Sequence, residues 1–110
     1  MKSVTEINER EFEAEVRKAN QIVLMAFLAP WSRQCQILRQ VLDEVAALYP
    51  GEVKIDLVNV DDNPRLSISY GIESVPTLLY FAGGRLRGRA VGTVSKEAIL
   101  AQLEIFSDVW

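Results

Sequence analysis

The sequence contains no histidine and only one cysteine, Cys35. A single thiol cannot form a disulfide within the chain. Without histidine or further cysteines we expect neither a zinc nor an iron–sulfur centre built by this chain alone. No apolar run is longer than residues 22–30, which is too short to cross a bilayer. Residues 1–16 lack the apolar stretch of a signal peptide. These absences predict a soluble, cytoplasmic protein that needs no metal or cofactor and has no membrane partner.

A strong excess of one charge is also missing, since the net charge is only −3. Such a chain has no overall positive field, so a nucleic-acid partner is not expected. The chain does have enough length and apolar content for a modest core, with 110 residues of which 49% are hydrophobic. This size predicts a single domain over residues 1–110.

Apolar periodicity and turn residues predict helices that alternate with strands. Asn8 with Glu11 forms a capping-box pattern at the start of a first helix, which should end near Asn20. The uniformly apolar residues 22–29 are typical of a strand covered on both faces. Further along we expect a helix over 32–48, a strand over 53–60, a short helix over 61–71, a hairpin of strands 75–81 and 85–92, and a last helix from Ser95. This order predicts an α/β fold, a central mixed sheet with helices on both faces.

Four motifs punctuate this order: "FLAPWSRQC" (27–35), "VNVDDNPRLSISYGIESVPTLLYFAGGR" (58–85), "SVPT" (74–77) within it, and "VGTVSKEAI" (91–99). The first resembles the strand-to-helix turn of the thioredoxin family, in which a tryptophan precedes C-G-P-C. "SVPT" resembles the family loop with a cis proline, and "VGTVSKEAI" its Val-Gly turn before the last helix. The resemblance covers nearly the whole chain and implies a thioredoxin fold.

The resemblance implies a redox site in which one of two cysteines has been replaced. In the family, an exposed thiolate at a helix N-terminus attacks a substrate disulfide, and a second cysteine then resolves the mixed disulfide. Ser32 holds the first position and Cys35 the second. Since a hydroxyl is scarcely ionised at neutral pH, Ser32 cannot perform thiol exchange. Whether the chain is an enzyme, a disulfide oxidoreductase like its family, therefore stays open.

Two further departures concern proton transfer at the second cysteine. The family's buried aspartate aligns with Ala26, and the lysine beside it aligns with Leu57. An isolated carboxylate in a core destabilises the fold, because it loses its hydration. Once proton transfer is no longer needed, replacing the aspartate and the lysine by Ala26 and Leu57 removes that destabilisation. The residues between the two redox positions are Arg33 and Gln34 in place of Gly-Pro.

Each site residue also has a structural interpretation. Ser32 suits a helix N-cap, Cys35 suits a small core position, and Trp31 suits a packing and contact residue. The resemblance implies a peptide-binding groove around Trp31, Val75, Pro76 and Gly92, in which the backbone of Val75 pairs with an extended protein segment.

Three arginines, Arg85, Arg87 and Arg89, alternate along the second strand of the hairpin, so we expect them to share one face. Charge on an edge strand resists unwanted strand pairing. The alternative is a surface for an acidic partner.

Three functions follow from these residues. The first is a binding module that keeps the groove near Pro76 for a protein or peptide but lacks dithiol turnover. The second is a monothiol redox protein in which Cys35 forms a mixed disulfide with glutathione or a partner thiol. The third is an active thioredoxin in which Ser32 was engineered, although Ala26 and Leu57 argue against it because one engineered change would not alter them.

Overall fold

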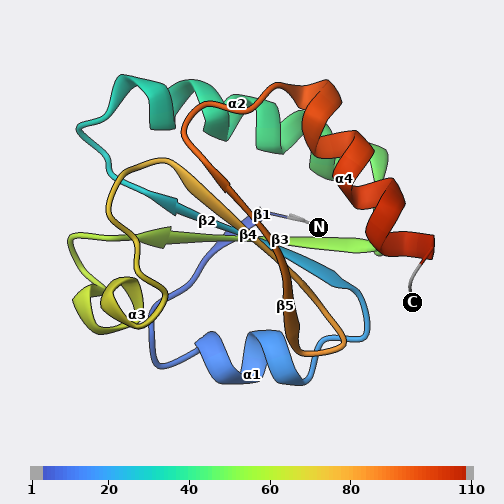
Figure 1. Cartoon of the computed structure of the whole chain (residues 1–110), viewed down its shortest axis with the longest axis horizontal. Helices are drawn as coiled ribbons and strands as arrows, with labels where there is room; N and C mark the ends of the chain where they lie inside the picture. The colour runs from blue at the N-terminus through green and yellow to red at the C-terminus, as the bar shows by residue number, and fades with distance from the viewer. Residues whose placement is uncertain (1–3, 109–110) are drawn as a thin grey trace.

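The computed structural model describes residues 4–108, in which four helices surround a five-stranded sheet (Figure 1). In chain order the elements are β1 (Val4–Glu6), α1 (Phe12–Arg17), β2 (Ile22–Leu28), α2 (Arg33–Leu48), β3 (Val53–Asn59), α3 (Pro64–Ser69), β4 (Thr77–Ala82), β5 (Arg85–Val91) and α4 (Lys96–Asp108).

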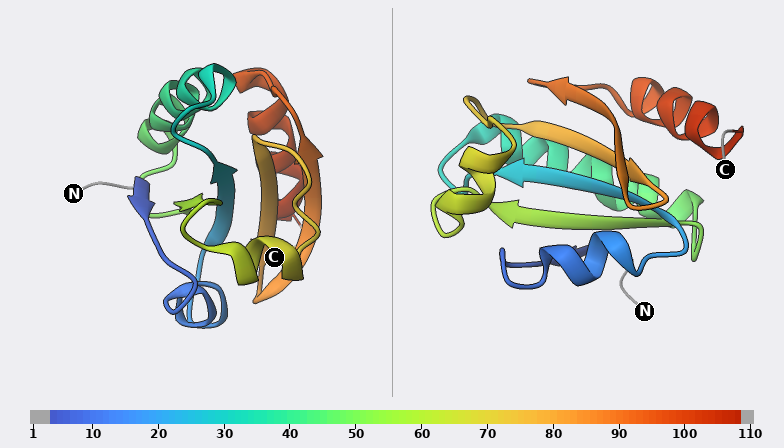
Figure 2. Two further views of the ribbon diagram at one scale, coloured as in Figure 1. Left: turned by 90° about the vertical axis from the view of Figure 1, so that its left-hand side faces the viewer. Right: turned by 60° about the horizontal axis from the view of Figure 1, so that its bottom comes forward.

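The sheet is mixed, with the strand order β1-β3-β2-β4-β5. β3 runs parallel to both β1 and β2, whereas β4 is antiparallel to β2 and to β5. α2 and α4 cover one face of the sheet, and α1 and α3 lie on the other (Figure 1 and Figure 2). The predicted α/β thioredoxin fold is confirmed.

β2 is the central strand, as its uniformly apolar sequence predicts. Every residue from Ile22 to Phe27 is buried. Alternate side chains point to opposite faces, so this one strand supplies both cores. Leu24 and Ala26 pack beneath α2 and α4, whereas Met25 and Phe27 pack on the side of α1 and α3.

β1 was not predicted from the sequence. It has three residues and pairs with β3 through Val4–Ile55, Thr5–Asp56 and Glu6–Leu57. A segment of three residues is too short to show an alternation of apolar and polar residues. What holds it in place is its backbone pairing with β3, which the sequence does not reveal.

The prediction that Arg85, Arg87 and Arg89 share one face is wrong. Arg85 pairs with Ala82, which packs on the α2 and α4 side, whereas Arg89 pairs with Leu79 on the α1 and α3 side. The register shifts between these two pairs and skips Arg87. An extra residue of this kind reverses the alternation of side chains, so the arginines do not form a single charged stripe.

Candidate functional site

The site begins where β2 ends and α2 begins. Ser32 is the N-cap of α2, with φ −88° and ψ 121°, and its Oγ accepts a hydrogen bond from the backbone N–H of Cys35 at 3.3 Å. This bond satisfies one of the unpaired N–H groups in the first turn of the helix. The capping interpretation of Ser32 is therefore confirmed, because its hydroxyl oxygen is hydrogen-bonded to the backbone of α2.

Cys35 lies one turn into α2 and is 2% exposed. Its Sγ accepts a hydrogen bond from the backbone N–H of Ala29 at 3.5 Å. On the same helix face, Leu38 and Leu42 are also buried. The only thiol of the chain is thus packed as a core side chain.

The surroundings of Cys35 contain no ionisable group at the two positions that the resemblance singles out. Ala26 and Leu57 are both buried and pair with each other across β2 and β3. A fully buried carboxylate, Asp56, directly precedes Leu57 on β3, but it pairs with Met25. Because adjacent strand residues point to opposite faces, Asp56 lies on the side of α1, away from the face on which α2 packs.

Trp31 is 71% exposed beside the N-terminus of α2. Its Nε1–H donates a hydrogen bond to a carboxylate oxygen of Asp61 at 3.0 Å. Trp31 follows β2 and Asp61 follows β3, and the carboxyl ends of adjacent parallel strands meet at one edge of a sheet. This edge is where ligands commonly bind in open α/β sheets.

A cavity of about 450 Å³ opens beside Trp31. It is lined by Trp31, Ser32, Gln34, Val60, Ile72, Glu73, Ser74 and Val75. The structure thus brings together residues from the start of α2 and from the loop before β4. Cys35 does not line this cavity; it lines a smaller one of about 120 Å³, between α2 and β3.

The remaining predicted groove residues lie next to this loop. The Val75–Pro76 peptide bond is cis, and the backbone N–H of Gly92 donates to the carbonyl of Pro76 at 2.8 Å. Pairing of β4 with its neighbours begins at Thr77, so Val75 takes no part in the sheet pairings of the described chain. Gly92 has φ +89°, a conformation that favours glycine.

Sequence reasoning missed the contributions of Asp61, Ile72 and Glu73 to this surface. The position of Asp61 shortly after β3 could have indicated its contribution, because Trp31 follows the adjacent parallel strand β2 in the same way. Ile72 and Glu73 belong to an irregular loop, for which apolar periodicity gives no signal.

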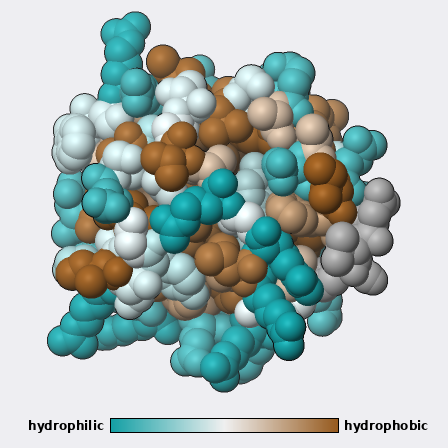
Figure 3. All heavy atoms as spheres, viewed as in Figure 1, coloured by the Kyte–Doolittle hydropathy of each residue, from teal (hydrophilic) through white to brown (hydrophobic). Residues whose placement is uncertain are grey.

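Between residues 4 and 108, no group of three or more His, Cys, Asp or Glu side chains is placed to hold a metal ion. None of the helices in this range is both long and apolar enough to cross a membrane. On the face seen in Figure 3, hydrophobic side chains lie in separate patches among hydrophilic ones.

Comparison with known proteins agrees with the fold. The Thioredoxin family model matches residues 3–105. The chain is 38% identical to Thioredoxin 1 of Nostoc sp. over 104 residues, which is 94% of this chain and 97% of that protein. It is 37% identical to the thioredoxin of Pyropia yezoensis over 101 residues, 92% of this chain and 94% of that protein. It is 36% identical to the thioredoxin of Synechocystis sp. over 104 residues, 94% of this chain and 97% of that protein. The chain therefore belongs to the thioredoxin family.

Proposed function

We propose that this thioredoxin-family protein binds an extended protein segment in the cavity beside Trp31 and Val75, and that it does not turn over disulfides as a dithiol. The observation that carries the proposal is the state of the two redox positions. Ser32 is a hydroxyl that caps α2, and Cys35 is 2% exposed. No exposed thiolate is present to make the first attack on a substrate disulfide.

The cavity supports binding of a protein segment. It has a volume of about 450 Å³, and its lining joins the start of α2 to the loop before β4. Val75 lies outside the sheet pairings, so its backbone can pair with an extended chain by strand addition. Trp31 adds a large exposed aromatic surface, a residue type that often dominates the energy of a protein interface.

The loss of dithiol chemistry is tested by insulin reduction. Native protein free of other thioredoxins should reduce insulin at the background rate of dithiothreitol alone. Catalytic turnover above that rate would refute the loss of dithiol activity.

Binding is tested by selecting phage-displayed random peptides on the immobilised protein. Selected peptides should bind Trp31→Ala at least about tenfold more weakly, since truncating a hot-spot aromatic removes 1.4 kcal/mol or more. Ile105→Ala is the matched control, because Ile105 is an exposed apolar residue on α4. Equal losses in both variants, or none in Trp31→Ala, would place binding elsewhere.

A second candidate function is a mixed disulfide at Cys35, favoured by the cavity of about 120 Å³ that its side chain lines. In this reaction the Cys35 thiolate would attack oxidised glutathione and release one glutathione thiol. The burial of Cys35, which is 2% exposed, opposes it. We expect no gain of mass by the folded protein in oxidised glutathione. A gain of one glutathione on Cys35 would favour this second function.

A further inference from the structure

A fully buried carboxylate lies beneath α1, on the opposite face of the sheet from α2. Asp56 on β3 is 0% exposed, and neither of its carboxylate oxygens has a hydrogen-bond partner within the described chain. Its only ion-pair partner there is Lys54, whose Nζ lies 3.8 Å from Oδ1. Burial raises the pKa of Asp56 to about 7; Lys54 opposes the increase, and Glu15 and Glu11 add to it. A proton on Asp56 is thus stabilised by the fold itself.

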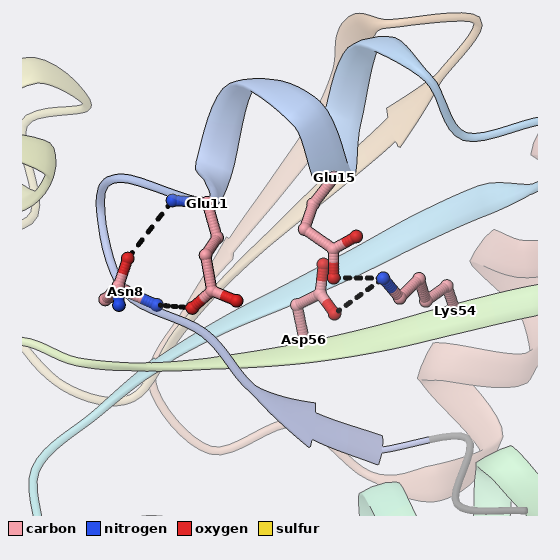
Figure 4. Close-up of polar contacts among 5 residues, drawn as sticks. All are labelled: Asn8, Glu11, Glu15, Lys54 and Asp56. Atoms are coloured by element: carbon pink, nitrogen blue, oxygen red, sulfur yellow. Dashed lines mark hydrogen bonds and ion pairs between the residues drawn. The ribbon is translucent and has the colours of Figure 1, made fainter.

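Lys54 is shared between two carboxylates. Lys54 and Asp56 are two residues apart on β3 and therefore point to the same face of the sheet. On that face the ammonium group of Lys54 also forms an ion pair with Glu15 of α1 (Figure 4). One positive charge therefore faces two negative charges whenever Asp56 is ionised.

The neighbouring strands place no charged side chain beside Asp56, whereas α1 contributes two acidic groups. Its pairing neighbours in the sheet are Thr5 on β1 and Met25 on β2, neither of which titrates near neutral pH. From α1, the acidic groups that act on it are Glu15 and Glu11. Glu11 is already bonded to the backbone N–H of Asn8 at 3.0 Å, at the start of the helix.

α1 has few other attachments to the sheet. It spans six residues, and Val16 is its only buried residue. The ring of Phe12 contacts Tyr70 and Phe81, with centroids 5.4 and 5.8 Å apart. Among the described residues, Glu15–Lys54 is the one ion pair that joins α1 to the sheet. Because so short a helix is not stable alone, a weaker Glu15–Lys54 pair should increase local opening.

We propose that loss of a proton from Asp56 weakens the attachment of α1 to the sheet, so that α1 is a proton-sensitive cover of this face. With Asp56 protonated, Lys54 pairs with Glu15 alone and α1 remains packed. When the proton passes to solvent, Lys54 is divided between two carboxylates that repel each other. α1 then opens more often and uncovers Val16 and the apolar side chains beneath it.

The test combines two NMR measurements on the full chain. The carboxyl ¹³C shift of Asp56 should titrate with a midpoint near 7. Amide exchange should report opening of α1 through the hydrogen bonds Glu15 N–H to Glu11 and Lys18 N–H to Ala14. Between about pH 6 and pH 8, protection of these two amides should fall about tenfold, following the ionised fraction of Asp56, and at each pH it should stay below the protection of β2 amides.

Three variants separate this mechanism from general loosening. Asp56→Asn should remove the pH dependence of α1 protection, whereas Asp62→Asn, a change at an exposed aspartate, should keep it. Glu15→Gln should lower the Asp56 midpoint, because it removes the competing negative charge. A midpoint below about 5 in the native chain would overturn the proposal. So would α1 amides that are as well protected as those of β2, because they would then exchange only when the whole chain unfolds. If Asp56→Asn does not fold, the titration midpoint of Asp56 in the native chain still tests the proposal.

Discussion

Replacing Asp56 by asparagine should stabilise the protein at neutral and alkaline pH. The side chain keeps its size, but it loses a charge that is buried without a hydrogen bond. Burial raises the pKa of Asp56 from 3.8 to about 7. Since each tenfold change in proton affinity corresponds to about 1.4 kcal/mol, ionised Asp56 lowers the free energy of unfolding by about 4 kcal/mol.

The sign of the effect follows from where each state binds the proton. Below the unfolded value of 3.8 the carboxyl is protonated in both states, and it contributes no pH dependence. Between 3.8 and about 7 the folded state holds a proton that the unfolded state has released, so stability falls as pH rises. Above about 7 both states are ionised, and the full loss remains. The advantage of Asp56→Asn should therefore grow from near zero at about pH 3.5 to about 4 kcal/mol at pH 8.

Urea unfolding of both proteins at several pH values measures this difference. With a slope of about 1–2 kcal/mol/M, the Asp56→Asn midpoint should exceed that of the native protein by about 2 M or more at pH 8. Asp62→Asn is the control, because Asp62 is exposed. The same pH dependence in the native protein and in Asp56→Asn would refute the reasoning, since the carboxyl would then titrate normally in the folded state.

Three further predictions concern the redox positions and the packing of β5. Ser32→Cys should form a disulfide with Cys35 under mild oxidation, which mass spectrometry would show as a loss of about two mass units. The variant should nevertheless reduce insulin slowly. Adding Ala26→Asp should raise the rate of insulin reduction by about 10²-fold or more, because it supplies the missing proton relay. Full activity of Ser32→Cys alone would contradict this. Native Cys35, being 2% exposed, should react with a thiol reagent only as fast as the protein opens, and rapid stoichiometric labelling would show an accessible thiol. Gly88→Ala should lower the free energy of unfolding by about 1–3 kcal/mol, because the added Cβ would lie 2.9 Å from Cζ of Phe106. In the double variant, Phe106→Leu should lessen that loss of stability. If the losses of the two single variants simply add, the clash between residues 88 and 106 is not the cause.

The central strand and the start of α2 could be predicted because their signals are local. Residues 22–28 are uniformly apolar, and only a strand covered on both faces buries all of them. Ser32 directly precedes a helical period, and a hydroxyl at that place caps the helix in almost any tertiary setting. The α/β fold class followed in the same way from the alternation of such elements.

The arrangement of the candidate site was only partly accessible in this way. The sequence places Ser32 and Cys35 three residues apart, one turn of a helix. It does not show that Trp31 donates a hydrogen bond to Asp61, since strand order brings these residues together across thirty positions. The three arginines of β5 show the same limit, because a shift in register decides which face each one occupies.

The sequence by itself determined which chemistry is available to this protein, because composition needs no coordinates. A chain with one cysteine and no histidine has a single thiol and no imidazole base wherever its residues lie. Only the tertiary structure decided what surrounds each group. Asp56 reads in the sequence as an ordinary charged residue of a strand, and it is buried because β1, β2 and α1 come from other parts of the chain to enclose it. Burial and proton affinity depend on such distant neighbours through desolvation and charge, so they exist only once the chain has folded.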